Sequence, residues 1–325
     1  MKRASASTGW RKQARLISRR PVVLPIVLFA IGLLVMFHLQ SRTESGSFMI
    51  TMLQTSLPLM CVSLGQTAVI ISGGLDLSVA GVMSITSALA ASHMTGNGDM
   101  AVWLPIMFGT GALAGLVNGL LVTFGGLPSF IVTLGTWSIL DGLALEILPT
   151  QGGSIAPGLE NLLGSNAATI IISIGLLAVW AVVRSTRFGV TIFSLGSGEG
   201  AARQAGLHVN TAKVSVYVFS ALTAVGAGLF YSAVVTLSGS PTAGDPFLLQ
   251  SFAAVVVGGT ALSGGKGGFL GTVFGALLLS VISQIVVFAG FQSYYSELAY
   301  GAILVIMVSV YSLPTLIAKS RRNTG

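Results

Sequence analysis

Residues 101–124, AVWLPIMFGTGALAGLVNGLLVTF, form an uncharged apolar run that decides the fold class of this chain. A helix needs about 20 such residues to cross a bilayer core of roughly 30 Å, so this run is long enough to span a membrane. We count about ten runs of this kind, with approximate limits 22–40, 48–72, 75–93, 101–124, 128–148, 169–184, 213–236, 248–262, 268–290 and 294–313. We therefore predict an all-α polytopic membrane protein with about ten transmembrane helices.

The composition argues against other classes of protein. Of the 325 residues, 53% are hydrophobic and 8% are charged, against roughly 25% charged in soluble domains. A soluble enzyme is nearly excluded, and so is a disordered chain. The one cysteine, Cys61, cannot form an intrachain disulfide, and His38, His93 and His208 show no metal-binding spacing. We expect no metal, no cofactor and no enzymatic activity.

The basic residues predict the orientation of the chain in the membrane. If the N-terminus is cytoplasmic, every Lys and Arg except Arg42 lies in or beside an inner segment, as the positive-inside rule requires. The net charge of +7 then reflects topology, not nucleic-acid binding. We expect basic cytoplasmic tails at 1–21 and 314–325, a transmembrane domain at 22–313 and a long cytoplasmic loop at 185–212.

Small residues recur every four positions and predict close helix packing, since lipid supplies no hydrophobic force between helices. Three such ridges occur, formed by Gly111, Gly115 and Gly119, by Gly267, Gly271 and Gly275, and by Ser220, Ala224, Gly228 and Ser232. Asn118 lies on the same helix face as the first ridge. It therefore forms an interhelical hydrogen bond or contacts a polar substrate.

The segment SGGLDLSVAG contains a carboxylate, Asp76, within a membrane region. Two glycines interrupt the helix there, and Asp76 with Ser78 can cap the next one. Alternatively, Asp76 lines the translocation pathway, because a carboxylate in a membrane region often has a functional role. The pattern GGxxLS recurs at Gly258, Gly259, Leu262 and Ser263, which hints at an internal repeat.

Motifs for other chemistry are incomplete. TALSGGKGG lacks the first glycine and the hydroxyl residue of a phosphate-binding loop, so this chain does not hydrolyse ATP. GNGD, at 96–99, matches the GxGD string of intramembrane aspartyl proteases, but the second Asp is missing. A secondary transporter would need a titrating acid in the membrane, for which Asp76, Asp141 and Glu146 are available.

Four segments closely resemble the permease subunits of bacterial ATP-binding-cassette sugar importers, in the branch that carries ribose, xylose, arabinose and galactofuranose. They are GGLDLSVAGVMSITSALAA (73–91), NGLLVTFGGLPSFIVTLGTWSILDGLAL (118–145), RFGVTIFSLGSGEGAARQAGLHVNTAKVSVYVFSAL (187–222) and AAVVVGGTALSGGKGGFLGTVFGALLL (253–279). The resemblance implies ten-helix permeases that work in pairs in the bacterial inner membrane. Its implied partners are a cytoplasmic ATPase and a periplasmic sugar-binding protein.

The resemblance also implies site residues. The segment GEGAARQAGL matches the family's coupling helix, so the implied ATPase contacts are Glu199, Ala201, Ala202, Arg203 and Gly206. Here Gly198 and Gly200 depart from the family's usual Asn and Lys. Gly200 costs a helix about 1 kcal/mol relative to Ala, which leaves the length of the coupling helix open.

We expect the translocation path to be lined or shaped by the polar and glycine residues Asp76, Ser78, Asn118, Thr133, Thr136, Gly258, Gly259 and Thr260. The predicted function is the permease of a carbohydrate importer. A permease for branched-chain amino acids or nucleosides, and a secondary transporter without an ATPase, remain alternatives.

Overall fold

The computed structural model describes residues 22–39, 45–292 and 294–322, with the backbone alone for 45–47 and 310–322. The predicted tail at 1–21 lies outside these residues. The described chain is helical, and its only β-type pairing is an isolated bridge between Gly152 and Gly239. The elements are α2 (Val23–Leu39), α3 (Ser45–Ile71), α4 (Ser78–His93), η1 (Asn97–Asp99), α5 (Met100–Thr123), α6 (Ser129–Ile147), α7 (Pro157–Leu163), α8 (Asn166–Ser185), α9 (Arg187–Ser197), α10 (Glu199–Gln204), α11 (Val209–Phe230), η2 (Tyr231–Val235), α12 (Asp245–Val257), α13 (Phe269–Phe288) and α14 (Tyr294–Arg322).

Each predicted apolar run contains one long helix, so the all-helical prediction is confirmed. By length and composition, six segments of the described chain are able to cross a membrane: Phe48–Ile71, Asn97–Thr123, Ser129–Ile147, Asn166–Ser185, Val209–Val235 and Phe269–Phe288. Three shorter apolar helices are Val23–Leu39, Asp245–Val257 and Tyr294–Ser309. The predicted loop 185–212 contains two helices, α9 and α10.

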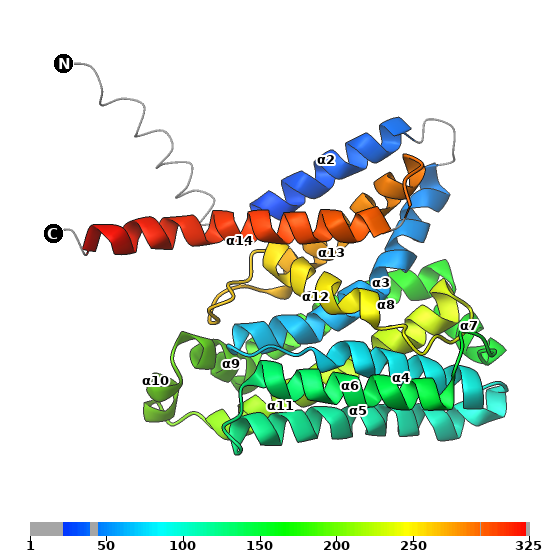
Figure 1. Ribbon diagram of the computed structural model, residues 1–325, viewed down its shortest axis with the longest axis horizontal. Coiled ribbons are helices and arrows are strands. Elements are labelled where there is room, and N and C mark those ends of the chain that lie inside the picture. The colour runs from blue at the N-terminus through cyan, green and yellow to red at the C-terminus, as the bar shows by residue number, and fades with distance from the viewer. Residues whose placement is uncertain (1–21, 40–44, 293, 323–325) are drawn as a thin grey trace.

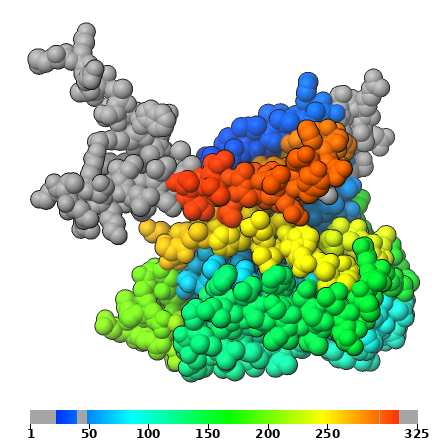
Figure 2. Space-filling view, in the orientation of Figure 1, coloured from blue at the N-terminus to red at the C-terminus, as the bar shows by residue number. Residues whose placement is uncertain are grey.

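The bundle has a buried centre and an apolar exterior. In α4 every residue of the range 78–91 is buried. Of the most apolar 18-residue stretch of α3, 67% of the residues are buried, whereas in the same kind of stretch of α8 only 17% are buried. The helices α4, α5, α6 and α11 lie side by side with roughly aligned axes, and α5 runs in the opposite direction to the other three (Figure 1). The side chains of α5 and α6 make up the lower part of the surface (Figure 2). Because α5, α6 and α8 keep large apolar side chains exposed, their outer faces suit lipid.

The glycines of α5 explain why it packs closely on α11. A Cβ atom at Gly115 would lie 2.6 Å from the Tyr217 carbonyl oxygen, and one at Gly119 would lie 2.7 Å from Val214 Cα. Gly111 faces α11 in the same way. Only a residue without a side chain allows two backbones to approach this closely.

The second ridge is shorter than predicted. Gly271 and Gly275 face the backbone of α12 at Gly258 and Ala254. Gly267, however, lies in the loop before α13 with φ +137°, so its predicted place on this helical ridge is wrong. The left-handed turn that Gly267 permits ends the loop and lets α13 begin at Phe269.

The third ridge, on α11 and η2, faces α3 and α4. Ser220 and Ala224 are buried, and a Cβ at Gly228 would lie 2.9 Å from the Met83 carbonyl oxygen. The Ser232 hydroxyl donates to Ser87 Oγ at 2.7 Å. The ridge therefore fixes α11 against the centre of the bundle.

The two ends of the helices carry different features. At one end α9 and α10 project, and α7 lies at the other (Figure 1). The Lys and Arg residues whose side chains the structure describes belong to the α9–α10 end, namely Arg184, Arg187, Arg203, Lys213 and Lys266. Asp99 and Glu160 lie in η1 and α7, at the opposite end.

Candidate functional sites: a coupling face, a polar interior and a cavity

The coupling face, defined here as α9 and α10, is built from short helices with clear ends. Thr186 caps α9, since its Oγ1 accepts from the Gly189 amide at 3.4 Å. After Gly198, α10 runs for only 6 residues. Gly206, at φ +75°, provides the left-handed residue that commonly follows a helix.

An ion cluster attaches α10 to α11. Glu199 pairs with Arg203 at 2.8 Å and with Lys213, in the first turns of α11, at 2.5 Å. Arg203 also donates to Asn210 Oδ1 at 2.7 Å. Hydrogen bonds from Lys213 and Arg203 lower the pKa of the Glu199 carboxyl below its usual value. The cluster therefore holds α10 in place at neutral pH.

The remaining predicted coupling residues divide into buried and exposed positions. Ala202 is buried against Leu195, Val209 and Ala212. Ala201 and Gly206 are exposed. A groove of about 340 Å³ runs between α9 and α10, and it is lined by Phe193, Ser194, Ser197, Gly198, Ala201, Ala202, Ala205 and Leu207. The exposed face and the groove are available to a partner protein.

The coupling face contacts the centre of the bundle through a glycine junction, defined here as Gly196, Gly264 and Gly265. The Gly265 amide donates to the carbonyl of Ile71, the last residue of α3, at 2.8 Å. A Cβ at Gly264 would lie 2.8 Å from Gly196 Cα, and one at Gly196 would overlap the Ile71 carbonyl oxygen. Our sequence reasoning missed Gly196, although a glycine near the end of an amphipathic helix was a visible signal.

Both GGxxLS segments contain the same kind of turn, but at different positions of the motif: the left-handed residue is the first glycine in 73–78 and the second glycine in 258–263. Gly73 and Gly259 have φ angles of +89° and +87° and follow the ends of α3 and α12. In both turns the residue after this glycine donates its backbone amide to a carbonyl five residues earlier in the chain. Gly74 donates to Val69 at 3.0 Å, and Thr260 donates to Val255 at 3.2 Å. These are Schellman caps, which require the left-handed conformation that glycine adopts readily. Gly258, Gly259 and Thr260 thus form the C-terminal cap of α12.

The polar interior, defined here as Asp76, Ser78, Asn118 and Thr136, is a hydrogen-bonded chain across three helices. Asp76 Oδ1 accepts from the Ser78 amide at 3.0 Å and from its hydroxyl at 2.6 Å. The Asn118 amide donates to Ser78 Oγ at 2.8 Å, and Thr136 donates to Asn118 Oδ1 at 2.6 Å. The chain joins the start of α4 to α5 and α6.

Three of the four residues of the polar interior are closed to solvent, and Thr136 is half-buried. Asp76 is 1% exposed, and Ser78 and Asn118 are fully buried. Asp76 Oδ2 and the Ser220 hydroxyl on α11 are also buried, and neither has a hydrogen-bond partner within the described chain. Thr133 lies nearby and is bonded to its own helix through the Ser129 carbonyl at 2.8 Å. These predicted path residues are therefore brought together, but between packed helices.

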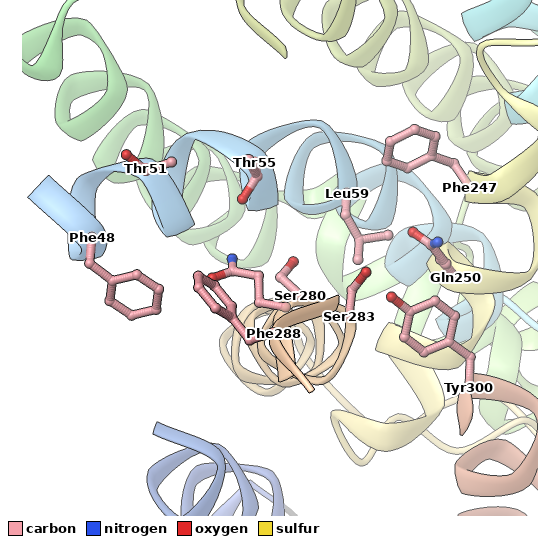
Figure 3. Close-up of a pocket in the computed structure, with 11 residues that line it drawn as sticks. Phe48, Thr51, Thr55, Leu59, Phe247, Gln250, Ser280, Ser283, Phe288 and Tyr300 are labelled. Atoms are coloured by element: carbon pink, nitrogen blue, oxygen red, sulfur yellow. The ribbon is translucent and has the colours of Figure 1, made fainter. Parts of the chain in front are cut away.

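A separate cavity of about 520 Å³ lies between α3, α12, α13 and α14 (Figure 3). None of the predicted path residues lines it. Its lining residues are Phe48, Thr51, Thr55, Leu59, Phe247, Gln250, Ser280, Ser283, Gln284, Phe288 and Tyr300. Sequence reasoning missed them because each is an ordinary residue of its own helix.

Comparison with known proteins assigns the family. The family described as "Branched-chain amino acid transport system / permease component" matches residues 48–308. The ribose import permease protein of Escherichia coli strain K12 is 34% identical over 297 residues, covering 86% of this chain and 91% of the relative. That of Bacillus subtilis strain 168 is 32% identical over 255 residues, covering 76% and 79%.

A fructose import permease protein of Rhizobium meliloti is 28% identical over 323 residues, covering 94% of this chain and 89% of the relative. No solved structure gives a significant match. The family match extends from the first half of α3 into α14, and so includes the coupling face, the polar interior and the cavity lining. This chain belongs to the branched-chain amino acid transport system / permease component family.

Proposed function

We propose that this chain is the membrane-spanning permease subunit of an ATP-binding-cassette importer that carries a monosaccharide into a bacterial cell. The observation that carries this proposal is the match to ribose and fructose import permeases over most of the chain. The chain performs no covalent chemistry. It provides a path that opens alternately to either side of the inner membrane.

The topology that we propose has ten membrane-spanning helices, α2, α3, α4, α5, α6, α8, α11, α12, α13 and α14. Both tails, 1–21 and 314–325, are cytoplasmic and flank a transmembrane domain at 22–313. The basic residues at the α9–α10 end support this orientation, because cytoplasmic segments of membrane proteins are enriched in Lys and Arg. The coupling face and the segment 185–212 are then cytoplasmic.

The partners are an ATPase subunit on the cytoplasmic side, a periplasmic sugar-binding protein on the outer side, and a second permease copy or a related chain. Ala201 and Gly206 contact the ATPase directly, since both are exposed beside the groove between α9 and α10. Glu199, Arg203 and Ala202 position α10 through the ion cluster and through burial. Movement of the ATPase then reaches α3 through the glycine junction.

The residues Asp76, Ser78, Asn118, Thr133 and Thr136 shape the translocation path by fixing the starts of α4 and α6. The burial of the first four and the hydrogen bonds that join Ser78, Asn118 and Thr136 support this role. Gly258, Gly259 and Thr260 do the same at the end of α12, where a Cβ at Gly258 would lie 2.5 Å from the backbone of Gly271.

The test compares uptake of radiolabelled D-ribose, D-xylose, L-arabinose and D-fructose in cells that carry the full importer. Wild type is compared with the double variant Glu199→Ala/Arg203→Ala, and ATPase recovery on the permease is measured in the same membranes. We expect the double variant to lose both uptake and bound ATPase. The control, Glu160→Ala, removes an exposed acid from α7 at the opposite end and should leave both unchanged.

Two results would contradict the proposal. Uptake that persists without bound ATPase would indicate a secondary transporter. Uptake of L-leucine by wild type, with none of the four sugars accumulated, would indicate an amino-acid permease.

A further inference from the structure

The cavity between α3, α12, α13 and α14 has the size and depth of a small-molecule site. Its volume of about 520 Å³ falls within the range of roughly 300–1,000 Å³ that ligand pockets occupy. Phe48, Leu59, Phe247 and Tyr300 are buried, whereas Phe288 is exposed at its edge. The cavity is therefore partly enclosed and opens to the surface on one side.

The polar lining is rich in hydrogen-bonding groups and carries no charge. No Asp, Glu, Lys, Arg or His is among the eleven lining residues. Ser283, Gln250 and Tyr300 point toward the same space from three helices (Figure 3). The Tyr300 hydroxyl lies near Ser283 (Figure 3). Within the described chain, the side chains of Gln250, Ser280 and Gln284 have no hydrogen-bond partner of their own, so they are free to bind a ligand or water.

Aromatic rings supply the apolar part of the lining. Phe247 is 6% exposed, and an edge contact with Tyr231, with ring centroids 5.4 Å apart, fixes its orientation. Phe48 and Phe288 lie at the other end of the cavity (Figure 3). Hydroxyl-binding amides and alcohols beside flat apolar faces match a molecule that has both C–H faces and hydroxyl edges.

We propose, resting on the proposed function, that this cavity binds one monosaccharide, an uncharged polyhydroxylated ligand, within each permease chain. Gln250, Gln284 and Ser280 hydrogen-bond its hydroxyl groups, and Phe247 packs on a C–H face. With the orientation given above, the first half of α3 and the second half of α13 place the cavity in the outer half of the membrane. Sugar released by the periplasmic protein thus has a binding position before the cytoplasmic side opens.

The lining argues against an amino acid as the ligand, despite the name of the family. A zwitterion buried here would carry an ammonium and a carboxylate group without an opposite charge, which is unfavourable in a site of low polarity.

The first experiment measures protection of a cysteine introduced in the cavity. Cys61, the native thiol, is buried and is replaced by Ser, and Ser280→Cys is added in the full importer in membrane vesicles without ATP. The probe is 2-hydroxyethyl methanethiosulfonate, a small neutral thiol reagent. At a sugar concentration four times the dissociation constant, we expect labelling to slow about fivefold. The same concentration of L-leucine should have no effect.

The control places the cysteine outside the cavity, as Ser173→Cys on α8. Its labelling should not respond to any of the ligands. The proposal is overturned if a sugar that wild type imports leaves Ser280→Cys labelling unchanged, or if L-leucine alone slows it. If wild type imports no sugar, the proposed function fails instead, so the two failures are distinguishable.

The second experiment separates binding in the permease from binding in the periplasmic protein. Gln250→Leu and Gln284→Leu keep side-chain bulk and remove the amides. We expect the maximal uptake rate to fall about threefold to tenfold, as for loss of one hydrogen bond to an uncharged ligand, with ATPase recovery unchanged. The sugar concentration for half-maximal uptake should stay constant, since the periplasmic protein sets it.

The matched control is Gln54→Leu, because Gln54 donates to the Gly164 carbonyl at 3.1 Å and does not line the cavity. It should lower protein abundance at most, with the uptake rate per permease unchanged. Equal rates per permease for wild type, Gln250→Leu and Gln284→Leu would overturn the proposal.

Discussion

The glycine junction and the cavity lie at different levels of the same bundle. The junction is formed by backbone atoms in close contact, whereas the cavity is formed by side chains. At the junction, Gly196, Gly264 and Gly265 bring three backbone segments into contact, leaving no room for side chains. In the cavity, side chains from four helices surround open space, and three of the polar ones lack partners in the described chain. We expect the contact between backbones to transmit displacement, and the unpaired side chains to bind a ligand. The two regions should therefore respond oppositely to substitution.

The largest expected effect comes from adding one methyl group to the glycine junction. In Gly196→Ala the new Cβ would overlap the Ile71 carbonyl oxygen and the Gly265 amide. Overpacking of this kind costs about 1–3 kcal/mol, and we expect uptake to be lost with it. Thermal unfolding in detergent and sugar uptake measure the two effects.

The control for this variant is Gly175→Ala on α8, where a Cβ would meet nothing within 4 Å. It should be as stable as wild type or slightly more stable, because Ala favours a helix. Wild-type stability and uptake in Gly196→Ala would show that the junction is not a close backbone contact.

Asp76 tests whether the polar interior acts through its charge or through its shape. Asp76→Asn keeps an oxygen that accepts from Ser78, so stability and uptake should remain close to wild type. Leu77 is the N-cap of α4, so Asp76→Ala removes not a cap but the acceptor of two buried donors on Ser78, and should cost about 1–3 kcal/mol. Loss of uptake in a stable Asp76→Asn protein would instead assign the carboxylate charge to the pathway.

The ion cluster should contribute less, since its members are partly exposed. The Glu199 and Arg203 side chains are 40% and 51% exposed, and Lys213 is 24% exposed. A double-mutant cycle with Glu199→Gln and Lys213→Met should give a coupling energy of about 0.2–1 kcal/mol. A coupling energy well above this range would mean that the ion pair is more shielded from solvent than these exposures indicate.

The cavity should tolerate a change that the junction cannot. Ser280→Ala removes a hydroxyl without a partner in the described chain, so we expect the free energy of unfolding to change by no more than about 0.5 kcal/mol. The same detergent unfolding assay gives the comparison with Gly196→Ala. Strong destabilisation would mean that Ser280 supports the fold.

The smallest expected effect is that of pH on the coupling face. The pKa of Glu199 is lowered in the folded protein, so its ion pairs stabilise the fold above its ordinary pKa and are lost only as pH falls through the lowered value. ATPase recovery on the permease should therefore be constant between about pH 8 and about pH 6. A decrease within that interval would mean that another titrating group controls the contact.

Much of the fold could be predicted from the sequence because apolar length and glycine spacing are local signals. Each apolar run contains a helix, and the GG pairs at 73–74 and 258–259 end two of them. The error at Gly267 arose because a four-residue spacing continued past the start of α13. Spacing alone does not report where a helix begins.

The candidate sites were harder to predict, since they depend on contacts between distant residues. Asn118 and Thr136 could be singled out as polar, but their mutual hydrogen bond depends on how α5 meets α6. Thr55, Gln250 and Tyr300 meet only after four helices pack. Gln and Thr on such helices are common, so no local pattern marks them.

The buried position of α4 also has a consequence for synthesis of the protein. Because α4 is short and rich in Ser, Thr, Gly and Ala, it is not among the helices that are long and apolar enough to cross a bilayer alone. Its neighbours in the bundle include α6 and α11, which leave the ribosome later. A newly made α4 therefore lacks these packing partners until the chain has been translated through α11. Until then a hydroxyl of α4 finds partners within its own helix, as Thr86 does by donating to the Val82 carbonyl at 2.6 Å.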